Sequence, residues 1–410
     1  MQLPILSQKS LKTKSLALPS LSAKETSGGY LKPSDWPDIR LNCPANAIAI
    51  LATHSADFTS YNNLGFKATV TGGYNVFIDG VQYGSTYASG AQCSITWSTA
   101  GITTGYDITT PVSLRAHIIH ILPATEGNNI TAYQGQRVAA SGTETQGIVW
   151  LHFNLDTSID VASATFVSGY YRNALLTAVT AKNNTLKTSR SENCFAYSSY
   201  LSFLPTFDYQ QNAYSNALRA FLTMYAFYNT NLKQITLKNT SEYASSMELF
   251  CNGYSSLKSV SVINGTLKPT DLRAAFRYCN SLLKLPDIDY SNCTLAADFL
   301  TEAANLQDTV IDMRTATALT AVGAYGTATY PMRGLKGLRV SSSAPFTYAT
   351  APQINIAYTG LTREALLTLF GDLPTVSAGQ IVYIVGASGA ADLTAEDIAI
   401  ATAKGWTVTR

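Results

Sequence analysis

The chain has 410 residues, which is enough for two or three domains. Apolar residues make up 46% of it and charged residues only 13%, so the composition excludes a disordered chain and predicts a surface of neutral polar side chains. The net charge of +2 argues against nucleic acid as a partner, because nucleic-acid binding normally requires a basic stripe.

The first segment, residues 1–40, predicts an extended arm. Prolines interrupt its helical patterns, and a segment this short cannot bury its own leucines. Two interpretations stay open: a frayed terminus, or an arm that becomes ordered along another protein. Disordered tails are usually poor in apolar residues, so the regularly spaced leucines favour an anchoring arm. Its anchoring residues would be Leu3, Leu6, Lys9, Leu11, Lys12, Lys14 and Leu16.

The second segment, residues 41–165, predicts a β-sandwich domain of Ig-like character. Apolar and polar residues alternate with the period of two that half-buried strands require. Gly72-Gly73 and Asp79-Gly80 are expected to form hairpin turns, because such turns need positive φ angles. The expected strands are residues 46–51, 66–72, 74–80, 92–97, 114–124 and 148–156.

The third segment, residues 166–410, predicts a solenoid of repeats. A leucine recurs at Leu232, Leu257, Leu282 and Leu306, in steps of 25, 25 and 24 residues. This period falls in the range of about 20–29 residues that leucine-rich repeats have. Each leucine opens an expected strand, and a single repeat cannot bury its apolar face, so successive repeats must stack.

Apolar residues also recur ten, six and three positions before most of the repeat leucines: Leu222, Met247 and Leu272, then Phe195, Cys251, Phe276 and Leu300, then Tyr254, Cys279 and Ala303. This spacing places them on one helical face, so we expect a helical return in each repeat and an α/β solenoid. Cysteines occupy two of these positions, and no C-x-x-C pair occurs. We therefore expect free buried thiols. The six cysteines are Cys43, Cys93, Cys194, Cys251, Cys279 and Cys293.

The end of the chain predicts a cap on the solenoid. Residues 361–373 and 393–406 have helical patterns, with Thr362 and Thr394 as the expected N-caps. A strand is expected over 382–385, between the helices, and a last one over 406–409.

A family resemblance accompanies this pattern. AAFRYCNSL (274–282) resembles the AFxxCxxL signature of BspA-like leucine-rich repeats, and SSLKSVSV (255–262) is similar. The tail over 373–408 resembles the ending of such repeat proteins from Bacteroides and its phages. Residues 72–97 are similar to a β-domain of tailed-phage structural proteins, including those of crAss-like phages. The resemblance covers roughly the last 200 residues.

The sequence predicts no catalytic residue, metal site or cofactor. It contains no Walker A, G-x-S-x-G or H-E-x-x-H motif. His117 and His120 are three residues apart in an expected strand, so they face opposite sides and cannot share a metal. A capsule depolymerase that uses Asp287 and Asp289 is the weakest alternative. The chain has no run of 18 apolar residues, so no membrane span is expected.

The resemblance implies a non-enzymatic structural virion protein of a tailed phage, a head or tail fibre assembled in the host cytoplasm. The arm would dock on other virion proteins of the capsid or tail, and the repeats of a homo-oligomer would bind a host-surface glycan or protein. A bacterial cell-surface adhesin of the BspA-like type is the alternative, although we expect no secretion signal at the start of the chain. The expected exposed ladder of the repeats is Gln234, Thr236, Ser259, Ser261, Lys284 and Arg339.

Overall fold

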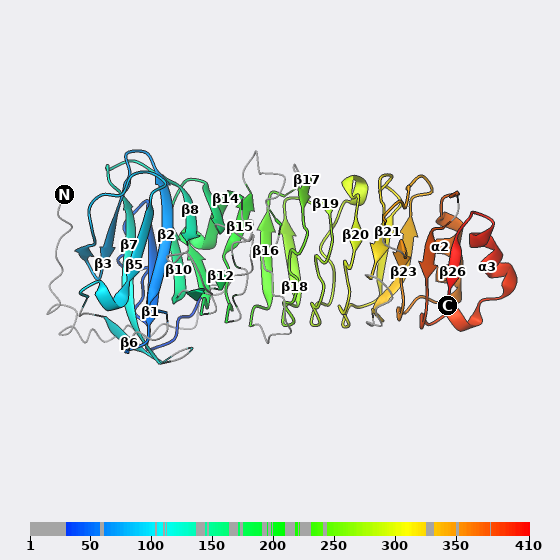
Figure 1. The fold of residues 1–410 in the computed structure, drawn as a ribbon, viewed down its shortest axis with the longest axis horizontal. Coiled ribbons are helices and arrows are strands. Elements are labelled where there is room, and N and C mark those ends of the chain that lie inside the picture. Colours follow the sequence, from blue (N-terminus) through cyan, green and yellow to red (C-terminus); the bar gives the residue numbers. More distant parts are fainter. Residues whose placement is uncertain are drawn as a thin grey trace.

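The computed structural model shows an elongated, mostly β molecule whose strands stack from the N-terminal sheets to the C-terminus (Figure 1). The predicted anchoring residues of the arm lie outside the described part of the chain. The described residues are 30–57, 61–102, 105–109, 111, 113–136, 144–145, 147–163, 171–172, 175–190, 195, 198, 200–209, 218–219, 221, 231–240, 244–324, 332–349, 352–377 and 379–410.

Two large sheets organise the first half. Sheet A contains, in spatial order, β13 (Ala178–Ala181), β10 (Ile148–Asn154), β1 (Ala47–His54), β7 (Leu114–Pro123), β3 (Tyr74–Ile78) and β4 (Val81–Gln82), with β6 (Tyr106–Ile108) also paired to β7. Sheet B contains β18 (Ser259–Ile263), β16 (Gln234–Lys238), β15 (Thr206–Tyr209), β14 (Thr185–Arg190), β11 (Ile159–Ser163), β8 (Ile130–Gln136), β2 (Asn63–Val70) and β5 (Gln92–Thr96).

Sheet B changes its pairing along its width. Strands β5, β2 and β8 are antiparallel, whereas every later neighbour, from β11 to β18, is parallel. The same sheet therefore belongs to the antiparallel N-terminal part and to the parallel stack, and it crosses the predicted boundary at residue 165 without a break in hydrogen bonding.

All six strands expected between residues 46 and 156 are present, as β1, β2, β3, β5, β7 and β10. The Asp79-Gly80 turn joins β3 to β4 as a two-residue hairpin, with positive φ at both residues. The prediction of a hairpin at Gly72-Gly73 is wrong. Both glycines have positive φ, but they carry the chain from β2 in sheet B to β3 in sheet A, so the flanking strands do not pair.

Strand β1 is buried on both faces. Ile48 and Ile50 belong to a core that sheet A shares with sheet B, while Ala49 and Leu51 face a second core on the outer side of sheet A. Tyr30, Trp36 and Ile39 supply that second core and are at most 8% exposed. The last part of the predicted arm thus packs on the chain's own sheet.

The central repeats form a β-solenoid, and their predicted helical returns are wrong. Those expected positions that the structure describes are buried, but they lie in short strands and turns. The amides of Leu249, Cys251 and Gly253 bond to the next coil at Arg273, Ala275 and Arg277, in place of a carbonyl four residues back. Positive φ angles recur at equivalent positions, which no α-helix tolerates: Leu249, Gly253, Ala274, Tyr278, Asp298 and Glu302.

Smaller sheets complete the stack. Strands β21 (Thr309–Met313) and β23 (Leu335–Val340) continue the strand side, and a two-residue pair joins β9 (Glu144–Thr145) to β12 (Tyr171–Arg172). The return side contains β17 (Ala244–Ser246), β19 (Lys268–Asp271), β20 (Ala296–Ala297), β22 (Val322–Gly323) and β24 (Ile354–Asn355). Short 3-10 turns occur at Trp97–Thr99, Lys182–Asn184, Tyr290–Asn292 and Ala390–Asp392.

The predicted C-terminal cap is confirmed. Helices α2 (Arg363–Asp372) and α3 (Ala395–Thr402) begin after Thr362 and Thr394, whose hydroxyls accept bonds from the amides of Ala365 and Asp397. Strands β25 (Ile381–Tyr383) and β26 (Thr407–Thr409) extend the sheet of β24. Within the described residues, neither helix is long and apolar enough to cross a membrane.

Candidate functional site

The predicted ladder is best formed on two neighbouring strands, β16 and β18. Gln234 lies beside Ser259, and Thr236 lies beside Ser261. Between them the apolar pair Ile235 and Val260 points into the core, which forces the polar pairs outward because side chains alternate along a strand. Gln234 is exposed and the other three polar side chains are half-buried.

Lys284 lies on the next coil, in a bend where no strand is formed. The amide of Leu283 donates to the carbonyl of Lys258 (3.2 Å), and the carbonyl of Leu283 accepts from Gln307 (2.9 Å). These two bonds place the exposed Lys284 beside the β18 end of the ladder.

Arg339 lies further along the stack, next to the cap. It lies on β23, with Asp312 of β21 opposite it, and its guanidinium Nη2 donates to Asp372 of helix α2 at 2.9 Å. This hydrogen bond raises the pKa of Arg339. It also joins β23 to helix α2 of the cap. The candidate surface is therefore Gln234, Thr236, Ser259, Ser261 and Lys284, which we call the ladder.

Charged side chains near the return strands are paired with each other. Glu248 accepts bonds from Arg219 (2.9 Å) and Arg273 (3.2 Å), and Arg273 also contacts Asp271 at 2.7 Å. Arg277 lies 3.3 Å from Asp298 on the following coil. The return side is thus a network of ion pairs, whereas the ladder is largely neutral.

The histidines divide between the two faces of sheet A, as predicted. His117 points into the shared core, where its Nε2 lies 3.1 Å from Nε2 of His54 and its Nδ1 lies 2.9 Å from Asp79. Trp97 stacks on His117, and burial lowers the pKa of His54. His117 is 1% exposed, so a substrate cannot reach its side chain. His120 faces the outer side, where burial lowers its pKa.

The two carboxylates of the depolymerase alternative have separate surroundings. Asp289 caps the turn at Tyr290–Asn292 by accepting from the amide of Ser291 (3.0 Å), which is the main cause of its lowered pKa. Lys268 lies 3.7 Å from Asp289, while Asp287 is exposed. Among the described residues, no group of three or more His, Cys, Asp or Glu side chains is arranged to hold a metal.

No protein-family model, curated protein or solved structure matches this chain.

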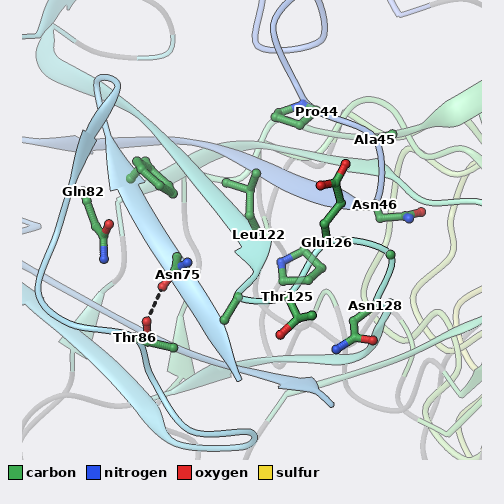
Figure 2. Close-up of a pocket in the computed structure, with 14 residues that line it drawn as sticks. Pro44, Ala45, Asn46, Asn75, Gln82, Thr86, Leu122, Thr125, Glu126 and Asn128 are labelled. Atoms are coloured by element: carbon green, nitrogen blue, oxygen red, sulfur yellow. Dashed lines mark hydrogen bonds between the residues drawn. The ribbon is translucent and has the colours of Figure 1, made fainter. Parts of the chain in front are cut away.

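A hollow at the N-terminal end of the molecule was missed by sequence reasoning. It has a volume of about 700 Å³ and lies over the outer face of β3 and the end of β7 (Figure 2). Three segments far apart in the sequence line it: residues 44–46, 75–86 and 122–128. Each is a loop or strand end with ordinary turn residues, so no local pattern marks them as one site.

Proposed function

We propose that the chain is a non-enzymatic structural virion protein of a tailed phage, a fibre of the head or tail. The arm docks on capsid or tail proteins, and the solenoid carries the ladder outward. The observation that supports this most directly is the continuous hydrogen bonding of sheet B from β5 to β18, which makes the two halves one elongated body. Such a body suits a spacer that holds a binding surface away from a particle.

We further propose the finer relationships that the resemblance implies. The coil step of 24–25 residues and the buried Leu232, Leu257 and Leu282 support a relationship to BspA-like leucine-rich repeats in which strands and turns replace the helices. The core shared by sheets A and B supports an Ig-like sandwich.

The ladder is the proposed host-binding surface. Its hydroxyl and amide groups offer neutral hydrogen bonds to a glycan or a protein, and several copies in a homo-oligomer compensate for a weak single site. A bacterial surface adhesin of the BspA-like type uses the same surface and remains the second candidate, because the ladder does not depend on what anchors the chain.

Labelling purified particles with an antibody against this chain tests the virion assignment. We expect label on particles, and label found only in infected-cell lysate would refute the proposal. Deletion of residues 1–29 tests the anchor: the truncated protein should fold but fail to join particles. A matched variant that keeps the arm and carries Thr236→Ala and Ser261→Ala should join particles normally and lose host binding.

A further inference from the structure

The hollow at the N-terminal end has the chemistry of a binding site for an uncharged, hydroxyl-rich ligand. Its lining combines amide and hydroxyl side chains with apolar ones. The amide and hydroxyl side chains are Asn46, Asn75, Gln82, Thr86, Thr125 and Asn128. The apolar ones are Pro44, Phe77, Leu122 and Pro123. A volume of about 700 Å³ lies within the range of about 300–1,000 Å³ that small-ligand sites occupy.

Hydrogen bonds to the surrounding chain fix the polar groups. Thr86 donates its hydroxyl to Oδ1 of Asn75 (2.7 Å), which leaves the Nδ2 donors of Asn75, a lining residue of the hollow, available to a ligand. Asn128 donates Nδ2 to the carbonyl of Thr71 (2.6 Å), which leaves its Oδ1 as an acceptor. Figure 2 shows Asn75 and Thr86 on one side of Leu122, with Glu126, Asn46 and Asn128 on the other.

The backbone around the hollow is also held in place. Tyr74 and Tyr87 exchange two backbone bonds (2.9 and 2.8 Å), which fix the segment of Thr86 against β3. The amide of Ala124 donates to the carbonyl of Gly73 (3.0 Å), which fixes the opposite wall. A side chain at Gly73 would overlap the carbonyl of Tyr87, so this close approach requires glycine there. The site is therefore formed before any ligand arrives.

The charge of the lining selects the ligand class. The fourteen described lining residues include one carboxylate, Glu126, and no lysine, arginine or histidine. Phosphate, sulfate and carboxylate ligands would meet no cation there. Amides that present a fixed donor on one wall and a fixed acceptor on the other match neighbouring hydroxyls of a sugar ring, and Phe77 offers an apolar face for its C–H side.

We propose that this hollow binds a neutral saccharide, at a site separate from the ladder. Such binding does not depend on the proposed virion function, because it follows only from the lining of the hollow. In Figure 1 the strand β3 lies at one end of the molecule and the ladder strands β16 and β18 lie near its middle, so the two binding surfaces occupy different parts of the chain.

Binding of the full chain to a panel of neutral and sialylated oligosaccharides tests the proposal. We expect neutral hexose- or N-acetylhexosamine-terminated glycans to bind and sialylated ones to bind at least tenfold more weakly. Asn75→Asp keeps the shape and the acceptor for Thr86 but removes both donors, so it should weaken binding at least tenfold. Glu126→Gln, on an exposed loop, removes the one carboxylate of the described lining, so it should leave neutral-glycan binding in place and narrow the difference from sialylated glycans.

Val310→Ala, at a side chain 62% exposed on β21, is the matched control and should leave this binding unchanged. Gln234→Ala with Thr236→Ala tests whether the ladder, in place of the hollow, carries the binding. Unfolding midpoints of all variants report whether the fold is preserved. The proposal is overturned if no neutral glycan binds, if sialylated glycans are preferred, or if binding survives Asn75→Asp. Loss of binding in the Gln234 and Thr236 variant would overturn it as well, and would assign the glycan to the ladder.

Discussion

The rings of Phe250 and Phe276 lie 5.8 Å apart with their planes at 83°, one coil above the other. Phe221 and Phe299 extend this contact to the coils on either side, at 5.6 and 5.8 Å. Edge-to-face packing of this kind adds to the stabilisation from burial alone. The row therefore ties successive coils together through a single column of side chains.

Removing one ring from this column should destabilise the solenoid. Phe276→Ala is expected to lower the free energy of unfolding by about 3–5 kcal/mol, because the cavity is enclosed by the neighbouring rings. Equilibrium urea unfolding of the full chain measures this loss. Leu283→Ala, at a side chain 39% exposed, is the control and should cost far less. Equal costs for the two variants would show that the column does not hold the coils.

A methyl group between two coils should be equally disruptive. A Cβ at Gly334 would overlap the backbone carbonyl of Leu306 on the preceding coil, so Gly334→Ala must push the coils apart. We expect a clear drop in the thermal midpoint. Gly371→Ala, in helix α2 with open space around it, should instead raise stability by up to about 1 kcal/mol. A rise in the thermal midpoint for Gly371→Ala and a drop for Gly334→Ala would support this role of Gly334, whereas an unchanged midpoint for Gly334→Ala would contradict it.

Acid should destabilise the protein through His152. Burial, with a smaller contribution from Arg40, lowers the pKa of His152 to about 4, and its Nδ1 lies 3.0 Å from the hydroxyl of Thr180. The unfolded chain binds this proton at about pH 6.5 and the folded chain only near pH 4. The contribution of His152, at most roughly 3 kcal/mol, is therefore complete above pH 6.5 and is lost as the pH falls towards 4.

Urea unfolding at pH 7.5, 6, 5 and 4 tests this dependence. His152→Asn keeps an acceptor near Thr180 without a titrating ring, so its stability should fall less steeply between pH 6.5 and 4. His54 and His120, whose pKa values are also lowered, leave a residual slope in both proteins. An unchanged slope in His152→Asn would contradict the assignment.

The buried thiols should be inert in the folded protein. Burial raises the pKa of Cys93 to about 11 and those of Cys43 and Cys293 to about 12, so almost no thiolate exists at pH 8. In a Cys194→Ser variant, which removes the one cysteine outside the described residues, a thiol reagent should react only after denaturation. Reaction of the native protein within minutes would indicate that the coils open.

Much of the fold could be predicted from the period and burial of particular residues. The leucine column, the strands of the first half and the capped C-terminal helices all follow from local patterns. The non-helical structure of the return segments could not be predicted. Phe276 and Cys279 have the same spacing of three residues whether the backbone amides bond within one coil, as in a helix, or to the next coil, as observed. The alignment of each coil with its neighbours decides between these two hydrogen-bonding patterns, and a single repeat of the sequence does not reveal that alignment.

The candidate sites show the same division. Gln234, Thr236, Ser259 and Ser261 were predictable because alternation along a strand fixes the side on which a residue lies. The pairing of Arg339 with Asp372 was not, because it joins a strand to the cap across 33 residues of sequence. Asn75 and Asn128 meet at one hollow only because the start of β3 pairs with the end of β7, directly before the loop that carries Asn128.

The repeating step of 24–25 residues makes the molecule adjustable in length. Each coil adds one strand spacing, about 4.8 Å, to the long axis, while the two ends keep their own structures. Duplication or loss of the gene segment for one coil would therefore change the length of the protein in fixed increments, without any change to either terminus.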